Sequence, residues 1–419
     1  MLFGIMESNP LFLKKLFLLF TLYFVQACPY GFQAGCLPII LRQNGLSFAN
    51  LGAIKLLFLP WICKPLISLK VEQKKQFWIF FTLIGLAFIC FWSADHVSIF
   101  QLFHVSLMLL SFNFLCATLD ICVDSLSVSL LDDDELGAAS TIQVVAYKTG
   151  AAVSGGLLLL LHEHFGWATM FYLFGMVYLF TVIGLYSLNT IPIVSIPEHK
   201  VHQSMSIIET WKELNIPGTT WVIYFVLIYK LNTHSSDIVP LFMSDKGLPT
   251  NLLAIGNTIG RIFSIIGSTY SGYLLTKKRS AIELIEMFCT IQLFSIFVQF
   301  CFIYFWGSEG VDLSHRMDIY LLFGNYITLY WNLFCSGAIT TACFTMMMSL
   351  SKKVPLSFFQ GTYFSLLCTF EILGKVLFAS TTGLVTDVMG PSFSVFCCMG
   401  LTALVLSSLK WSPLRKSER

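Results

Sequence analysis

Charged residues are scarce in this chain. They make up 11% of its 419 residues, whereas a soluble domain carries roughly 25%. Hydrophobic residues make up 56%, so most of the molecular surface has to face an apolar environment. This composition excludes an ordinary soluble domain and indicates a protein that lies in the lipid bilayer.

The sequence also lacks the short motifs of the common enzyme classes. It contains no P-loop, no G-x-S-x-G, no H-E-x-x-H and no glycine-rich nucleotide loop. Its 13 cysteines include no C-x-x-C pair and no zinc spacing, so we interpret them as small apolar packing residues. We therefore expect no enzymatic activity, no bound metal, no cofactor and no nucleic-acid partner.

Apolar runs of membrane-spanning length recur along the whole chain. We find twelve, at roughly 16–41, 48–69, 77–94, 97–123, 137–161, 166–189, 218–242, 249–275, 281–305, 317–349, 355–384 and 390–411. The predicted fold is an all-α membrane protein with twelve transmembrane helices, and a monomer suffices for it. The lysines and arginines of the predicted loops, such as Lys74, Lys75, Lys277 and Lys278, fall mostly on one side. This bias predicts a multi-pass protein with both termini in the cytoplasm.

The two halves of the chain share short sequence matches. Pro38, Gly45 and Leu46 match Pro240, Gly247 and Leu248, each pair 202 residues apart. Gly150 matches Gly374 at a separation of 224. The matches predict two pseudo-symmetric six-helix bundles, 1–189 and 218–419, joined by a cytoplasmic linker at 190–217. Chance similarity between apolar helices is the alternative.

Polar residues interrupt the first and seventh predicted helices at corresponding positions. They are Gln26, Tyr30 and Gln33 in the first helix and Lys230, Asn232 and His234 in the seventh. Polar groups buried in lipid are costly unless they find partners, and interrupted helices in paired repeats typically mark a substrate site. The alternative is that these side chains only hold helices together.

Basic residues inside the predicted spans outnumber the acidic ones. Lys148, Lys230 and Arg261 lie away from the ends of their spans, and they predict a cationic cavity for an anionic substrate. Structural ion pairs are the alternative. Lys64 is a weaker candidate, because its long side chain is expected to reach the cytoplasmic edge of the membrane.

Two pairs of charged residues have the four-residue spacing of one helix face. Glu371 and Lys375 can form an ion pair within their helix. A sharper hypothesis makes Glu371 a proton site, because an acid beside a cation in a low dielectric can change its charge during transport. Asp120 and Asp124 lie toward the cytoplasmic end of the fourth helix, where we expect them to gate the transport path or to dock a loop.

Three stretches resemble a known family. They are Val25–Gln33 (VQACPYGFQ), Lys55–Pro65 (KLLFLPWICKP) and Leu119–Gly156. They are similar to the major facilitator superfamily, and within it to the acetyl-coenzyme A transporter family and the bacterial muropeptide permeases. The resemblance implies a rocker-switch fold with a central cavity and a solute carrier, with acetyl-coenzyme A as one candidate solute. The chain departs from the family after the second helix, where the Trp-Ala-Pro run and its following Asp are absent.

These observations predict a secondary-active or facilitative transporter of an organic anion that works by alternating access. Its energy would come from the substrate gradient or from protons. Its partners would be the small anionic substrate, the lipid bilayer and protons. The alternative is a receptor-like or scaffolding membrane protein that keeps the fold without transport, and the altered segment after the second helix favours it.

Overall fold

Helices form all the regular structure in the described part of the chain. The structure is a computed structural model that describes residues 10–37, 40–41, 54–98, 101–132, 135–187, 217–230, 236, 238–239, 242–243, 246–248, 250–306, 316–354 and 357–413. The helices of the first half are α2 (Pro10–Gly31), the π-helix η1 (Phe32–Cys36), the 3-10 helix η2 (Lys55–Phe58), α5 (Leu59–Ile62), α6 (Lys64–Gln73), α7 (Lys75–His96), α8 (Leu102–Leu130) and α9 (Leu136–Ser187). Those of the second half are α11 (Thr219–Tyr229), α13 (Thr250–Thr276), α14 (Ala281–Phe305), α15 (Arg316–Lys352), α16 (Ser357–Met389) and α17 (Pro391–Lys410).

Seven of the described helical segments are long and apolar enough to cross a membrane. They are Phe12–Gly31, Lys75–His96, Leu102–Leu130, His164–Ser187, Ala281–Phe305, Arg316–Lys352 and Pro391–Lys410. Several agree closely with the apolar runs of the sequence; the run at 281–305 coincides with α14. The chain is therefore a multi-pass integral membrane protein.

The predicted span at 48–69 is not one continuous helix. Its described part consists of η2, α5 and α6, and a turn at Cys63 separates the last two. Pro60 and Pro65 each stand in the first turn of a short helix. Proline has no backbone N–H to donate to the preceding turn, so each one favours a helix start over a helix interior. The run is mostly hydrophobic apart from Lys55 and Lys64, and its apolar length does not reveal the break at Cys63.

Gly166 separates two spans that the sequence predicts at 137–161 and 166–189. The structure has helical residues on both sides of it throughout α9, but Gly166 itself has φ 80° and ψ 175°. A residue with a side chain rarely adopts this backbone conformation, whereas glycine does so at little cost. The chain therefore turns at Gly166 and begins a second membrane-crossing segment.

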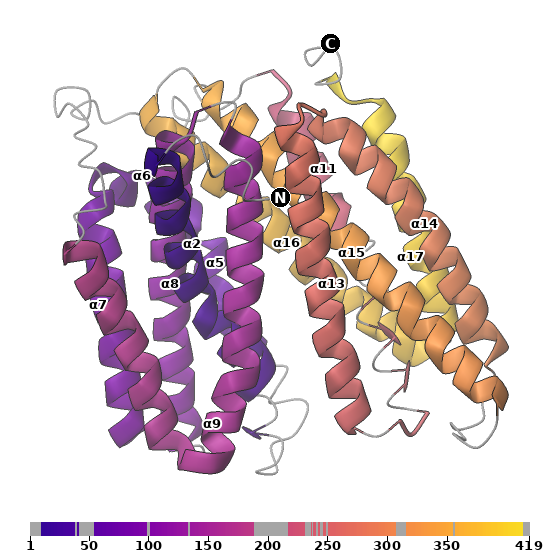
Figure 1. Ribbon diagram of the computed structural model, residues 1–419, viewed down its shortest axis with the longest axis horizontal. Helices are drawn as coiled ribbons and strands as arrows, with labels where there is room; N and C mark the ends of the chain where they lie inside the picture. The colour runs from indigo at the N-terminus through magenta and orange to yellow at the C-terminus, as the bar shows by residue number, and fades with distance from the viewer. Residues whose placement is uncertain are drawn as a thin grey trace. The chain divides into compact units, whose positions relative to one another are not determined.

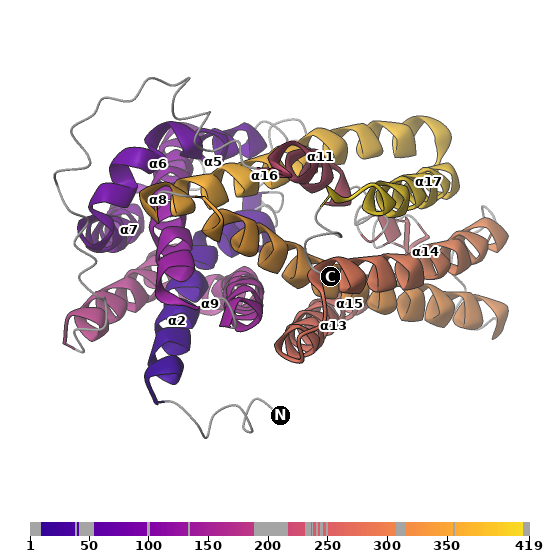
Figure 2. The ribbon, with the colours of Figure 1, turned by 90° about the horizontal axis from the view of Figure 1, so that it is seen from above.

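The chain divides into two compact units. Unit 1 comprises Met1–Ile216 and Ser349–Thr369, and unit 2 comprises Pro217–Met348 and Phe370–Arg419. In unit 1, α9 packs against α2 and α7, and α8 packs against the same two helices (Figure 1). In unit 2, α14 and α17 lie side by side (Figure 2). The domain boundaries predicted from the sequence stay a prediction, and residues 190–216 of the predicted linker lie outside the described residues.

The repeated glycines make the same kind of contact in each unit. A Cβ atom at Gly150 of α9 would lie 2.2 Å from the carbonyl oxygen of Phe24 on α2. A Cβ atom at Gly374 of α16 would also lie 2.2 Å from a carbonyl oxygen, that of Leu227 on α11. Only a residue without a side chain permits such a close approach of two helices. This shared packing supports the internal repeat that the sequence matches predict.

Candidate functional site

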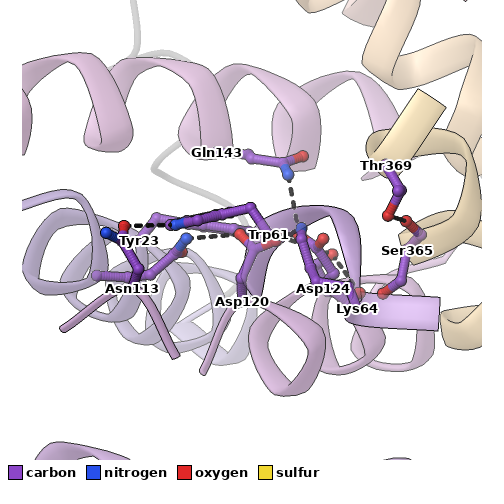
Figure 3. Close-up of polar contacts among 11 residues, drawn as sticks. Tyr23, Trp61, Lys64, Asn113, Asp120, Asp124, Gln143, Ser365 and Thr369 are labelled. Carbon is purple, nitrogen blue, oxygen red and sulfur yellow. Dashed lines mark hydrogen bonds and ion pairs between the residues drawn. The ribbon is translucent and has the colours of Figure 1, made fainter. Parts of the chain in front are cut away.

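Unit 1 contains a group of polar side chains that are almost completely buried. We call it the polar cluster, and it consists of Tyr23, Gln26, Lys64, Asp120, Asp124 and Gln143. Figure 3 labels all of them except Gln26. Asp120 and Asp124 share one face of α8 because four residues make about one helical turn. Tyr23 and Gln26 are three residues apart and share one face of α2, because residues three or four apart are neighbours on a helix surface. The other two members come from α6 and α9.

Both carboxylate oxygens of Asp120 have partners. Gln26 donates its amide Nε2 to Oδ1 at 2.5 Å. The ammonium group of Lys64 forms an ion pair with Oδ2. Lys64 is only 1% exposed, so the expectation that it reaches the membrane edge is wrong: the buried carboxylate holds it inside. A buried charge of this kind is tolerated because its partner is close and hydrogen-bonded.

Asp124 uses only one of its two carboxylate oxygens. Its Oδ1 accepts hydrogen bonds from the Tyr23 hydroxyl at 2.9 Å and from Gln143 Nε2 at 3.0 Å. Its Oδ2 is buried and has no hydrogen-bond partner among the described residues. The side-chain oxygens Gln26 Oε1 and Gln143 Oε1 are also buried without a hydrogen-bond partner within the described part of the chain. The polar cluster thus contains two carboxylates, one ammonium and three buried oxygens that could accept a hydrogen bond.

A second chain of hydrogen bonds starts beside Lys64. The Lys64 ammonium lies 5.1 Å from the ring centre of Trp61, within the range of a cation–π contact. Trp61 donates its indole N–H to Asn113 Oδ1 at 2.9 Å. Asn113 donates in turn to Gln33 Oε1 at 2.9 Å. These contacts connect the start of α6 to η1 through α8, and they bury Gln33 inside the helix packing.

Unit 2 contains a separate ion pair. Lys230, at the end of α11, lies 3.1 Å from Glu371 Oε1 on α16. The Tyr229 hydroxyl donates to the same oxygen at 3.2 Å. Lys230 also donates to Thr340 on α15 at 3.3 Å. The four side chains tie α11, α15 and α16 together, and Lys230 serves as a counter-ion within protein.

The remaining predicted site residues have varied surroundings. Tyr30 packs its ring against Tyr147 at 5.7 Å and against Phe58 at 5.9 Å. Lys148 is half-buried on α9. Arg261 is exposed on α13. Asn232 and His234 lie outside the described residues, and so does the side chain of Lys375.

The structure therefore places the predicted site residues in two separate groups, one in each unit. Gln26, Asp120 and Asp124 belong to the polar cluster, whereas Lys230 and Glu371 form their own pair in unit 2. Sequence reasoning missed Tyr23 and Gln143 and misjudged Lys64. Tyr23 and Gln143 are uncharged and sit in apolar helices, so no local pattern marks them. The position of Lys64 directly before Pro65, with Pro60 four residues earlier, was a usable signal, because a helix that starts at a lysine places its charge where the chain turns.

The ion pairs also change the charge balance of the predicted cationic interior. Asp120 neutralises Lys64, and Glu371 neutralises Lys230. Among the described residues, Lys148 and Arg261 are the remaining basic side chains well inside predicted spans. No group of three or more metal-binding side chains occurs in the part of the chain that the structure describes.

A bundle of membrane-spanning helices with charged side chains buried in it is typical of membrane transporters. Comparison with known proteins points to the same class. The profile of the Major Facilitator Superfamily matches residues 19–360. This chain belongs to that superfamily. The fold class predicted from the sequence, an all-α transmembrane protein of the major facilitator fold, is confirmed.

Two curated relatives illustrate the range of similarity. The anhydromuropeptide permease of Escherichia coli (strain K12) is 22% identical over 404 residues, which cover 93% of this chain and 77% of the permease. An uncharacterised protein of Schizosaccharomyces pombe is 31% identical over 170 residues, which cover 36% of this chain and 32% of that protein.

Solved structures of transporters share the fold. The superfamily transporter FucP in its outward conformation matches with a TM-score of 0.68 at 14% identity, over 95% of this chain and 98% of FucP. A bacterial homologue of the iron transporter ferroportin, in an outward-facing state, matches with a TM-score of 0.68 at 14% identity, over 96% of this chain and 100% of that chain. At such low identity the likeness concerns the fold alone.

Proposed function

We propose that this chain is a secondary transporter that moves a small organic anion across its membrane by alternating access. Membership of the superfamily and the similarity to a named permease support transport. The lysine and arginine bias of the loops supports cytoplasmic termini. The anionic nature of the solute rests chiefly on Arg261, a basic residue well inside its predicted span whose side chain is exposed.

The position of Arg261 on α13 is the observation that carries the proposal. Among the described side chains of this helix, the exposed large apolar ones form one stripe, made of Leu252, Ile255, Ile259, Ile262, Ile266 and Tyr270. At about 100° per residue, Arg261 lies roughly 140° around the helix from the centre of that stripe. Arg261 is exposed nevertheless. The stripe suits lipid, and the arginine suits a different, polar environment.

A charged side chain inside a membrane normally faces water or a partner, because a position in lipid costs about 2.5 kcal/mol or more. An exposed arginine away from the apolar stripe therefore fits a water-filled solute path. Its guanidinium group binds carboxylates and phosphates through two parallel hydrogen bonds. Solutes with those groups are the class that we propose.

Lys148 is the second candidate contact for the anion. It is half-buried on α9, directly after Tyr147, whose ring contacts that of Tyr30. Successive residues of a helix point about 100° apart, so the two aromatic rings lie on a different side of α9 from Lys148, and the sequence predicts Tyr30 to be in the site. An ammonium group and aromatic faces together suit an organic anion with a flat or apolar part.

Two solutes are the first to test. Acetyl-coenzyme A follows from the family resemblance, and an anhydromuropeptide follows from the named permease. Purified protein in liposomes should take up one of the labelled compounds in a saturable manner, and a proton gradient applied across the liposome shows whether uptake is driven. If folded protein takes up neither compound and no other organic anion, the non-transporting alternative becomes the better account.

A further inference from the structure

We infer that Asp124 in unit 1 is a proton-binding site, with the proton on its Oδ2 atom. This inference rests on the proposed function for the use of the proton, which is to couple solute movement to a proton gradient. The site itself rests on the contacts of the polar cluster. Glu371, the acid that the sequence puts forward first, has a basic partner in Lys230 at 3.1 Å, so it has less need of a proton.

The charges of the polar cluster do not balance without a proton. Asp120 and Asp124 face a single ammonium group, that of Lys64, which pairs with Asp120. Asp124 is 0% exposed and has no ion-pair partner among the described residues. A carboxylate that is buried without a counter-ion tends to take up a proton instead of keeping its charge. One proton brings the net charge of the cluster from −1 to 0.

The hydrogen bonds show which oxygen would carry the proton. Tyr23 and Gln143 both donate to Oδ1, so that oxygen has to be an acceptor. Oδ2 is buried and without a partner in the described part of the structure. A proton on Oδ2 makes it a donor, and Gln143 Oε1 and Gln26 Oε1 are buried acceptors of the same cluster that still need a hydrogen bond.

The other ionisable groups around Asp124 come from several helices. Tyr23 approaches from α2, Lys64 from α6 and Asp120 from the preceding turn of α8. Lys75 of α7 contacts the Ser125 carbonyl at 3.5 Å, and it also contacts Ser129. The part of α16 that belongs to unit 1 contributes the thiol of Cys368, near Lys64.

Figure 3 adds the neutral side chains of Ser365 and Thr369, which lie on the Lys64 side of the cluster. Because these side chains are neutral, they do not compensate a charge. Deprotonation of Asp124 would create a second carboxylate near Asp120, and the two carboxylates would compete for Lys64. Binding of the proton and the pairing of Lys64 are coupled for this reason.

A small metal cation is the competing occupant. The three unpartnered oxygens, Asp124 Oδ2, Gln26 Oε1 and Gln143 Oε1, are of the kind that bind hard cations. Such ions take about six oxygen ligands at ordered protein sites, whereas a proton needs one. The small number of oxygens favours the proton.

Infrared difference spectroscopy of the purified protein tests the site without any solute. A pH change should produce a carboxyl C=O band from a protonated, buried aspartic acid, and 13C-labelled aspartate should shift that band. Asp124→Asn should abolish it. Glu371→Gln and the double variant Lys64→Met/Asp120→Asn should keep it, since both leave Asp124 in place.

The inference is overturned if the wild-type protein shows no such band in labelled samples, or if Asp124→Asn retains it. A band that responds to Na⁺ in place of choline at constant pH would also overturn it, in favour of a cation site. Because the measurement needs no solute, failure of the uptake assay with an intact band would count against the proposed function alone. If Asp124→Asn does not fold, the isotope-labelled wild-type protein still decides the matter.

Transport adds a second readout once a solute is found. Asp124→Asn should lose accumulation of that solute driven by a proton gradient but keep exchange of labelled for unlabelled solute, because exchange requires no net proton movement. Loss of both with the infrared band intact in the wild type would assign Asp124 a structural part in transport instead of a coupling one.

Discussion

Lys230 and Glu371 form an ion pair within unit 2, with Nζ and Oε1 3.1 Å apart. Their helices, α11 and α16, are far apart in the sequence, and the local spacing pointed instead to Lys375 as the partner of Glu371. The contact shows that an acid in a membrane helix takes the nearest cation in space. Whether Lys375 also reaches Glu371 stays a prediction, because its side chain lies outside the described residues.

Removing one partner of this pair should destabilise the protein. We expect Glu371→Gln to cost about 3 kcal/mol, the lower end of the range for a broken buried pair, because both side chains are slightly exposed. The double variant Lys230→Met/Glu371→Leu should recover most of that loss. Thermal unfolding in detergent measures the difference as a change in apparent melting temperature.

Lys353 is exposed, so Lys353→Met is the control for the loss of a lysine. Its melting temperature should equal that of the wild-type protein within experimental error. If Lys230→Met/Glu371→Leu is no more stable than Glu371→Gln, the stability lost in Glu371→Gln does not come from breaking the ion pair.

The repeated glycines give a second prediction. Gly150→Ala and Gly374→Ala should each destabilise their own unit by about 1–3 kcal/mol, because the new methyl group would lie 2.2 Å from a carbonyl oxygen. Gly400→Ala is the matched control, since nothing lies within 4 Å of its Cβ position. In the control, alanine should be neutral or stabilising by up to about 1 kcal/mol. Equal melting temperatures for all three variants would contradict the close helix approach.

Arg261 gives a prediction about transport. Once a transported anion is known, Arg261→Gln should raise its KM by at least about tenfold, which corresponds to about 1.4 kcal/mol of lost binding. Arg261→Lys should restore part of the affinity, because it keeps the charge but not the two parallel hydrogen bonds. The neighbouring Ile262→Leu, on the apolar stripe, is the control. Unchanged KM in Arg261→Gln would remove the main support for an anionic solute.

Asn113 gives a prediction about the packing of unit 1. Asn113→Leu should leave the Trp61 indole N–H and Gln33 Oε1 buried without their partner. Each unpaired buried polar group costs about 1–3 kcal/mol, so we expect a loss of about 2 kcal/mol or more. Thr181→Val changes an α9 hydroxyl that bonds only within its own helix, and it should have little effect. A stable Asn113→Leu would mean that the hydrogen-bond chain contributes little.

Much of the fold could be predicted from the amino-acid sequence alone. Apolar runs located α7, α14, α15 and α17 within a few residues, because a bilayer demands long apolar helices whatever surrounds them. The boundary between the runs at 137–161 and 166–189 agrees with the turn at Gly166. The break at Cys63 was missed, because the proline there acts through backbone conformation, whereas the search for spans follows hydrophobicity.

The sequence by itself determined that this protein spans a membrane and predicted two related halves, since composition, apolar length and repeated glycines are properties of the linear chain. It also identified Asp120, Asp124, Lys230 and Glu371 as unusual, because charges are rare in apolar helices. Only the tertiary structure decided their partners: Lys64 with Asp120, Lys230 with Glu371, and none for Asp124 Oδ2 among the described residues. The physical reason is that electrostatic pairing depends on distance in space, and helices distant in sequence supply the nearest charges.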